Sequence, residues 1–75
     1  MKIINAGDIV EFDYLNWKGI KGHRTVFIKC FKFGQTEYHH EDQWLMDAYD
    51  YDKHDTRIFA MKDMINVEIV NPIND

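Results

Sequence analysis

The stretch QWLMDAYDYDKHDTRIFAM, residues 43–61, decides the fold because it holds two strand-like segments on either side of a charged turn. In QWLMDAYD, the apolar side chains of Trp44, Met46 and Ala48 occupy every second position. A period of two is typical of a β-strand and disfavours the alternative of a helix over the same residues. The polar segment YDKHD and the following TRIFAM predict a tight turn and a returning strand, so the stretch is expected to form a β-hairpin.

Three further strands are expected outside this hairpin. DIVEFDYLNW alternates Val10, Phe12 and Tyr14 with acidic residues, and the glycines of KGIKG turn the chain towards RTVFIKCFKF. KDM is long enough for one helical turn and INVEIV for a short last strand, after which Pro72 prevents further pairing inside a sheet. The five expected strands span residues 8–17, 24–33, 43–50, 56–61 and 65–70.

The second of these strands has apolar side chains on both faces. Strict alternation places Val26, Ile28 and Cys30 on one face, with Phe27 and Phe31 on the other. We therefore expect part of this strand to be covered on both sides. On this alternation, Cys30 is interpreted as a small core residue rather than a reactive thiol.

Length and composition indicate a single all-β domain, residues 1–75. Five short strands with almost no helix are typical of a small, strongly bent antiparallel sheet that closes into a barrel. A chain of this size buries a small core, and its eleven aromatic residues (five Phe, four Tyr, two Trp) supply bulky side chains for it. The single cysteine excludes an internal disulfide, so packing or self-association must provide the stability.

The net charge of −4 is unevenly distributed: residues 1–37 hold six basic and four acidic side chains, whereas residues 38–75 hold three and nine. An acidic chain is a poor candidate for non-specific binding to duplex nucleic acid, which requires phosphate neutralisation. The first residues do not resemble a signal peptide, and no apolar run is long enough to cross a bilayer. We therefore expect a soluble, cytoplasmic protein with no membrane partner.

The histidines and carboxylates of residues 39–55 are the candidates for metal or catalytic chemistry. His39 and His40 are adjacent, and adjacent side chains of an extended chain point to opposite sides, so the two are badly placed to share one ion. The chain contains no serine, and its carboxylates lack an evident cleft that would raise a pKa. We expect no catalytic residue, no metal site and no cofactor, with a metal-assisted hydrolase as the alternative.

The two arginines, Arg24 and Arg57, are the remaining candidates for ligand binding. Each guanidinium can hold a phosphate or carboxylate through two parallel hydrogen bonds. In the alternative interpretation, Arg57 pairs with Asp47 or Glu11 across the sheet and has a structural role only.

Several short motifs occur in a familiar order along the chain. Arg24 and Val26 form Arg-x-Val, residues 43–45 form Gln-Trp-Leu, residues 48–50 form Ala-Tyr-Asp, and residues 57–59 form Arg-x-Phe. The segment from 10 to 67 thereby resembles the WYL domain, a module of bacterial transcription regulators and phage-defence proteins. Its name-giving Trp-Tyr-Leu triplet aligns with Gln-Trp-Leu here.

The chain departs from the family pattern at three points. Ile28 stands where the family has proline, and residues 62–65 (Lys-Asp-Met-Ile) stand where the family has a second arginine. No helix-turn-helix segment precedes the strands in this sequence. We therefore expect the chain to act alone, as an oligomer or on a partner, rather than as a one-chain DNA-binding regulator.

The resemblance implies a barrel core of the Sm-like or SH3-like kind and a site that senses nucleotides or nucleic-acid fragments. Aromatic side chains stack on bases and arginines hold phosphates, so the implied chemistry is coherent. We expect a non-enzymatic regulatory module that binds a nucleotide, a short single strand or a similar anion. The expected ligand-binding residues are Arg24, Gln43, Trp44, Arg57, Tyr14 and Phe59.

The alternative function is a protein-interaction module. The small size and the acidic second half favour a phage or mobile-element accessory protein that binds a host defence or transcription protein. Acidic residues on the strand edges would also allow the chain to pair with itself as a homodimer.

Overall fold

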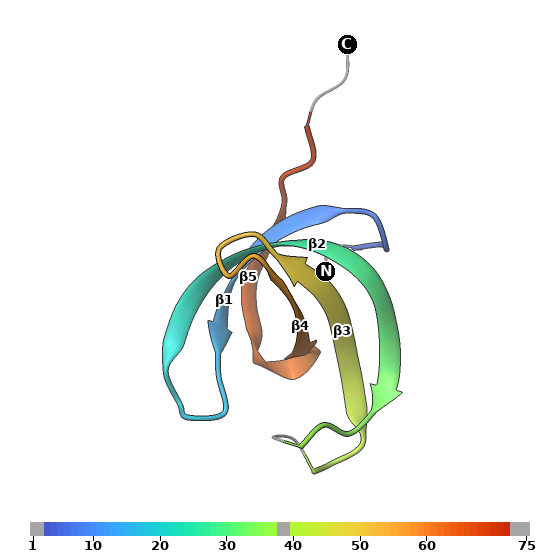
Figure 1. Cartoon of the computed structure of the whole chain (residues 1–75), viewed down its shortest axis with the longest axis vertical. Helices are drawn as coiled ribbons and strands as arrows, with labels where there is room; N and C mark the ends of the chain where they lie inside the picture. Colours follow the sequence, from blue (N-terminus) through green and yellow to red (C-terminus); the bar gives the residue numbers. More distant parts are fainter. Residues whose placement is uncertain (1–2, 38–39, 73–75) are drawn as a thin grey trace.

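The protein is described here by a computed structural model that covers residues 3–37 and 40–72. Five antiparallel strands form one sheet in the order β4-β3-β2-β1-β5 (Figure 1). The elements are β1 (Ile9–Leu15), β2 (Lys21–Gly34), β3 (Gln43–Asp50), β4 (Asp55–Ala60), the 3-10 turn η1 (Met61–Asp63) and β5 (Met64–Ile69). Within the described ranges, no helix is long and apolar enough to span a bilayer.

The all-β class, the five strands and the single helical turn are confirmed. The boundaries of β3 agree with those expected, and the other boundaries agree to within three residues. Closure into a barrel is not confirmed, because β4 and β5 are the outer strands of the sheet and no ladder joins them in the part of the chain that the structure describes. The sheet is strongly curved and open (Figure 1).

The curvature is greatest along β2, which has 14 residues and pairs with β1 through its first part and with β3 through its second (Figure 1). Its register with β3 shifts between Ile28, opposite Ala48, and Cys30, opposite Asp47. Lys29 is therefore an extra residue on β2, a β-bulge. A bulge bends its strand and increases the twist, which allows β2 to curve around the core.

The bulge overturns two expectations about β2. Strict alternation placed Cys30 in the core, but its side chain is exposed. Phe31, expected on the opposite face from Val26, packs against the core opposite Met46. Both differences have one cause: an extra residue reverses the face of every side chain that follows it.

The core lies on the concave face of the sheet. Its buried residues come from four strands: Val10, Phe12 and Tyr14 of β1, Val26 and Ile28 of β2, Met46 and Ala48 of β3, and Phe59 of β4. Three of them form an edge-to-face aromatic cluster, with ring centroids 5.2 Å apart for Phe12 and Phe59 and 5.0 Å apart for Tyr14 and Phe59. This cluster joins β1 to β4, which are not neighbours in the sheet.

A hydrogen bond reinforces the same connection. The backbone N–H of Ala60, the last residue of β4, donates to the Tyr14 hydroxyl at 2.8 Å. Both residues are buried, so this bond satisfies an amide that has no partner strand on the open side of β4. Tyr14 thus contributes to the core with its ring and links β1 to β4 with its hydroxyl.

We expect Phe12→Ala to abolish cooperative folding. Truncating a buried phenylalanine costs about 3–5 kcal/mol, which is comparable to the roughly 3–5 kcal/mol that a core of this size supplies. Urea denaturation followed by circular dichroism measures the loss. The matched control is Ile20→Ala, because the Ile20 side chain is 61% exposed; a similar loss of stability in the control would contradict the central role of the aromatic cluster.

Candidate functional site

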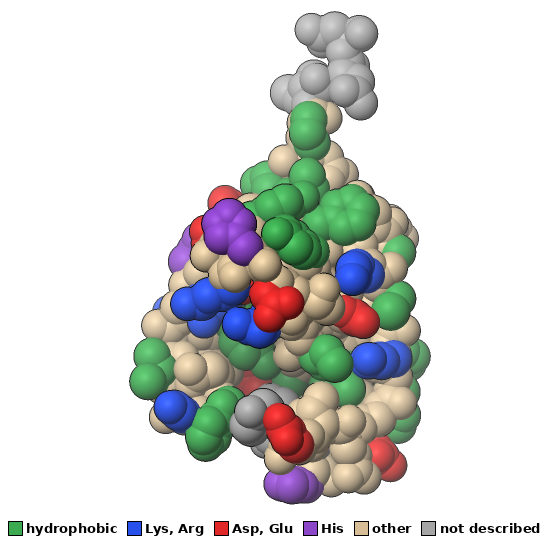
Figure 2. All heavy atoms as spheres, in the orientation of Figure 1, with side chains coloured by type: hydrophobic (Ala, Val, Ile, Leu, Met, Phe, Trp, Pro, Cys, Tyr) green, Lys and Arg blue, Asp and Glu red, His purple; other side chains and the backbone are tan. Residues whose placement is uncertain are grey.

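A cleft of about 840 Å³ opens on the concave side of the sheet and is lined by residues of the β1–β2 turn, the β2–β3 loop, the β3–β4 turn and β4. Figure 2 shows Lys and Arg side chains gathered beside a recess near the centre of this face. The cleft is lined by Tyr14, Asn16, Trp17, Arg24, Gln35, Thr36, Glu37, Asp50, Lys53, Thr56, Arg57, Ile58 and Phe59. We call it the cationic cleft, because three of its charged residues are basic and two are acidic.

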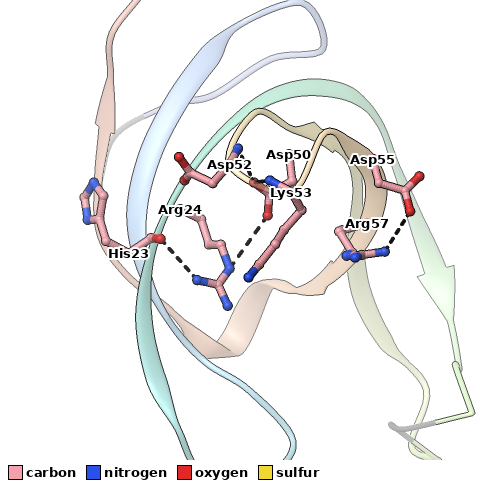
Figure 3. A network of polar contacts seen from close by, with 7 residues as sticks. All are labelled: His23, Arg24, Asp50, Asp52, Lys53, Asp55 and Arg57. Atoms are coloured by element: carbon pink, nitrogen blue, oxygen red, sulfur yellow. Dashed lines mark hydrogen bonds and ion pairs between the residues drawn. The ribbon is translucent and has the colours of Figure 1, made fainter.

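Three separate elements place the basic side chains in the cationic cleft. Arg24 lies on β2 opposite Phe12, and Arg57 lies on β4 opposite Ala48, so both belong to the concave face. Lys53 comes from the turn between β3 and β4. In Figure 3, the ends of the Arg24 and Lys53 side chains point into the space enclosed by the sheet.

Asp50, the last residue of β3, is the polar centre of this region and is fully buried. Its Oδ1 atom accepts the backbone N–H groups of Asp52 at 2.9 Å and Lys53 at 3.2 Å. Its Oδ2 atom has no hydrogen-bond partner, and the nearest cation is the Nε atom of Arg24 at 3.7 Å. That separation permits an ion pair but exceeds hydrogen-bond length. The buried charge therefore depends on Arg24 for its compensation.

Arg24 is fixed from a second side. Its Nη1 atom donates to the backbone carbonyl of His23 at 3.1 Å, and its side chain is only 22% exposed. Arg57 differs, since its side chain is 49% exposed and its Nη1 atom donates to Asp55 Oδ2 at 3.0 Å. The two arginines thus offer a partly buried, oriented guanidinium and a more exposed one that is partly neutralised.

The alternative pairing expected for Arg57 is wrong. Asp55 takes this role because it lies two residues before Arg57 on the same face of β4. Asp47 faces the other side of β3, where its Oδ2 atom lies 3.9 Å from Lys32 Nζ. Glu11 also lies outside the cleft, with its carboxylate 3.5 Å from the His23 ring.

The six expected site residues do not form a single site. Arg24, Arg57, Tyr14 and Phe59 line the cationic cleft, but Gln43 and Trp44 do not. Trp44 lies near the start of β3 and Asp50 at its end, so about 20 Å of strand separates them at about 3.3 Å per residue. Tyr14 and Phe59 are 6% and 3% exposed, so they form the floor of the cleft rather than surfaces for base stacking.

Gln43 and Trp44 line a second cleft of about 770 Å³ together with Ile4, Phe31, Phe33, Met61 and Lys62. We call it the apolar cleft. The rings of Phe33 and Trp44 meet at 5.4 Å between centroids, and both side chains are more than half exposed. Gln43 contributes a buried Oε1 atom that has no hydrogen-bond partner. An aromatic pair with few polar groups suits an apolar ligand or a protein side chain.

Trp17, Asp50 and Lys53 are among the residues of the cationic cleft that sequence reasoning missed. The Trp17 side chain is 57% exposed in the β1–β2 turn, with the Lys18 ammonium 5.3 Å from its ring centroid. Asp50 and Lys53 belong to an acid-rich segment whose charged side chains were interpreted as solvent-exposed. The Ala-Tyr-Asp motif contained the only signal for Asp50, and no local pattern distinguished Lys53.

Among the described residues, no group of three or more His, Cys, Asp or Glu side chains is placed so that it could hold a metal ion. Tyr38 and His39, which belong to the expected histidine-rich loop, lie outside the described residues. His40 is exposed.

No protein-family model matches the chain, and no curated protein or solved structure matches it either. The resemblance to the WYL domain, and the functions that it implies, therefore stay predictions.

The side chain of His23 lies on the outer face, beside two carboxylates. Its Nδ1 atom is 3.2 Å from Asp13 Oδ1, and this hydrogen bond, with a weaker contribution from Glu11, holds the pKa of the imidazole above its usual range. The same bond, together with one from Asn66, holds the pKa of Asp13 below its usual range. Both shifts favour the charged forms of the pair.

We expect the stabilising effect of His23 to depend on pH. Because its pKa is raised on folding, its contribution is complete below the unfolded value of about 6.5 and is lost as the pH rises through the folded value. The contribution of Asp13 is present above the unfolded value of about 3.9 and is lost as the pH falls through its lowered folded pKa. NMR titration should show the pKa of His23 falling in Asp13→Asn; an unchanged value would contradict this pairing.

Proposed function

We propose that this chain is a non-enzymatic, WYL-like regulatory module that binds an anionic ligand, a nucleotide or a short single-stranded nucleic acid, in the cationic cleft. The observation that carries the proposal is the convergence of Arg24, Lys53 and Arg57 on one cleft of a chain whose net charge is −4. Asp50 and Asp55 offset the charges of the two arginines, so Lys53 adds a positive charge to the cleft that an anionic ligand can balance.

The state of Lys53 supports this assignment. Among the described residues, no carboxylate lies within ion-pair distance of its Nζ atom, and Figure 3 shows that atom directed towards the interior of the curved sheet. Its backbone is held by Asp50, so the ammonium is presented from an ordered turn. Trp17 at the rim adds an exposed aromatic surface on which a base can stack.

The finer fold assignment, a small barrel of the Sm-like or SH3-like kind, belongs to the same proposal. It is supported by the bond between Ala60 and Tyr14 and by the short η1 turn that leads directly from one outer strand to the other.

We expect Lys53→Gln and Arg57→Gln to weaken ligand binding by about 10- to 100-fold, the effect of losing a hydrogen bond to a charged group. Isothermal titration with nucleoside monophosphates, a cyclic dinucleotide and a ten-nucleotide single strand provides the measurement. Both residues are exposed, so the variants should unfold at the wild-type temperature.

The charge-matched control is Lys32→Gln, because Lys32 is exposed and its ammonium lies beside Asp47, away from the cationic cleft. Equal weakening in this control would indicate non-specific attraction between the ligand and the whole chain. Absence of binding by the wild-type protein across all three probe classes would refute the proposed function.

The apolar cleft supports a second candidate function, the binding of a partner protein. Phe33 and Trp44 are 59% and 58% exposed and stand side by side, and large exposed aromatic side chains are enriched at the centres of protein interfaces. This surface is separate from the cationic cleft, so the two functions can be tested independently.

We expect Trp44→Ser to abolish association through the apolar cleft and to leave anion binding unchanged. Sedimentation velocity over a range of concentrations tests self-association as a homodimer, and co-purification from bacterial lysate tests other partners. Lys18→Gln serves as a control, because Lys18 is exposed in the turn between β1 and β2 and does not line the apolar cleft. If Trp44→Ser behaves as the wild type in both assays, the apolar cleft is not a protein-binding surface.

A further inference from the structure

The guanidinium of Arg24 lies directly over Gly22. A Cβ atom built on Gly22 would come within 2.7 Å of Arg24 Nη1, 3.4 Å of Cζ and 3.5 Å of Nη2. The backbone of Gly22 is not in the left-handed region, so its conformation is open to other residues. The glycine is therefore needed for space: a side chain at this position would displace the guanidinium.

Two polar contacts hold the same guanidinium from other directions. Asp50 Oδ2 lies 3.7 Å from its Nε atom, and the His23 carbonyl accepts a hydrogen bond from Nη1 at 3.1 Å. The three restraints come from Gly22 and His23 of β2 and from Asp50 at the end of β3, and Figure 3 shows the two polar ones. An arginine side chain loses considerable conformational freedom when it is ordered in this way.

The Nη2 atom remains open to the cationic cleft. Among the described residues, Arg24 makes one hydrogen bond, through Nη1, and Nη2 makes none. In Figure 3, the guanidinium and the Lys53 ammonium point into the same space. Both depend on Asp50, which contacts Arg24 through Oδ2 and holds the Lys53 backbone through Oδ1.

We propose that Gly22 and Asp50 are positioning residues that hold the Arg24 guanidinium as a preformed receptor for the anionic group of the ligand. Gly22 provides the space, Asp50 and the His23 carbonyl set the orientation, and Asp50 places Lys53 beside it. Because the arginine is ordered before the ligand arrives, binding does not have to order it. The inference rests on the proposed function and adds two residues that do not themselves contact the ligand.

The first test observes Arg24 without a ligand. The chain has only two arginines, so the Nε–H region of a 15N–1H NMR spectrum contains two side-chain signals, and Arg57 is the internal reference. We expect the Arg24 signal to exchange slowly with water and to shift or disappear in Gly22→Ala and in Asp50→Asn. The Arg57 signal should stay unchanged in Gly22→Ala.

The matched control is Gly34→Ala in the same strand, because a Cβ atom on Gly34 would meet nothing within 4 Å. Gly22→Ala should remain folded, since only the end of a flexible side chain must move, but it should be less stable than this control because Asp50 loses part of its compensation. An Arg24 signal that is the same in the wild type, Gly22→Ala and Gly34→Ala would overturn the proposal.

The second test measures binding of the nucleotide probes and of inorganic pyrophosphate. We expect Gly22→Ala to weaken binding about fivefold or more and Gly34→Ala to change it less than twofold. In the double variant Gly22→Ala/Arg24→Gln, the alanine should add no further loss to that of Arg24→Gln, because it acts through Arg24.

The outcomes separate this inference from the proposed function. Wild-type binding that Gly22→Ala does not weaken overturns the positioning role and leaves the proposed function standing. A rigid Arg24 in a wild-type protein that binds none of the probes overturns both, because the restraint is then purely structural.

Discussion

A single sheet with no second layer must bury its apolar face against itself, and the rest of this structure depends on that constraint. Every buried apolar residue of the core cluster belongs to the same five-stranded sheet. Contact between Phe12 on β1 and Phe59 on β4 is achieved only if the strands between them curve. The bulge at Lys29 lets β2 do so, because the extra residue bends the strand and redirects the side chains that follow.

The same curvature creates the cationic cleft. Most side chains on the concave face are apolar, but Arg24, Asp50 and Arg57 are charged. The curvature of the sheet places these charged side chains of β2, β3 and β4 around one cleft. Asp50 is the residue on which this cleft depends. Its Oδ1 atom accepts two backbone N–H groups of the turn that carries Lys53. Its Oδ2 atom forms the ion pair with Arg24. A single buried carboxylate therefore contacts both the turn and the arginine.

Much of the fold was predictable from local pattern, and the candidate site was predictable only in part. The period of two in β1 and β3 is a direct consequence of strand geometry, so the strands were found at nearly their observed positions. The face of Cys30 was predicted wrongly, because a bulge leaves no mark in the composition of β2. Arg24 and Arg57 were recognised by residue type, whereas Lys53 looked like any lysine of a polar turn.

The sequence by itself determined the all-β class, the five strands, the turn after β4 and the choice of Arg24 and Arg57 as candidate ligand-binding residues. These properties depend on neighbours a few residues apart, and side-chain alternation and turn chemistry act over that range. Only the tertiary structure decided that Trp44 and Arg57 lie in different clefts, that Arg24 rests on Gly22, and that the buried Asp50 pairs with Arg24. These relations depend on the curvature of the sheet and the register of its strands, which arise from contacts between residues far apart in the chain.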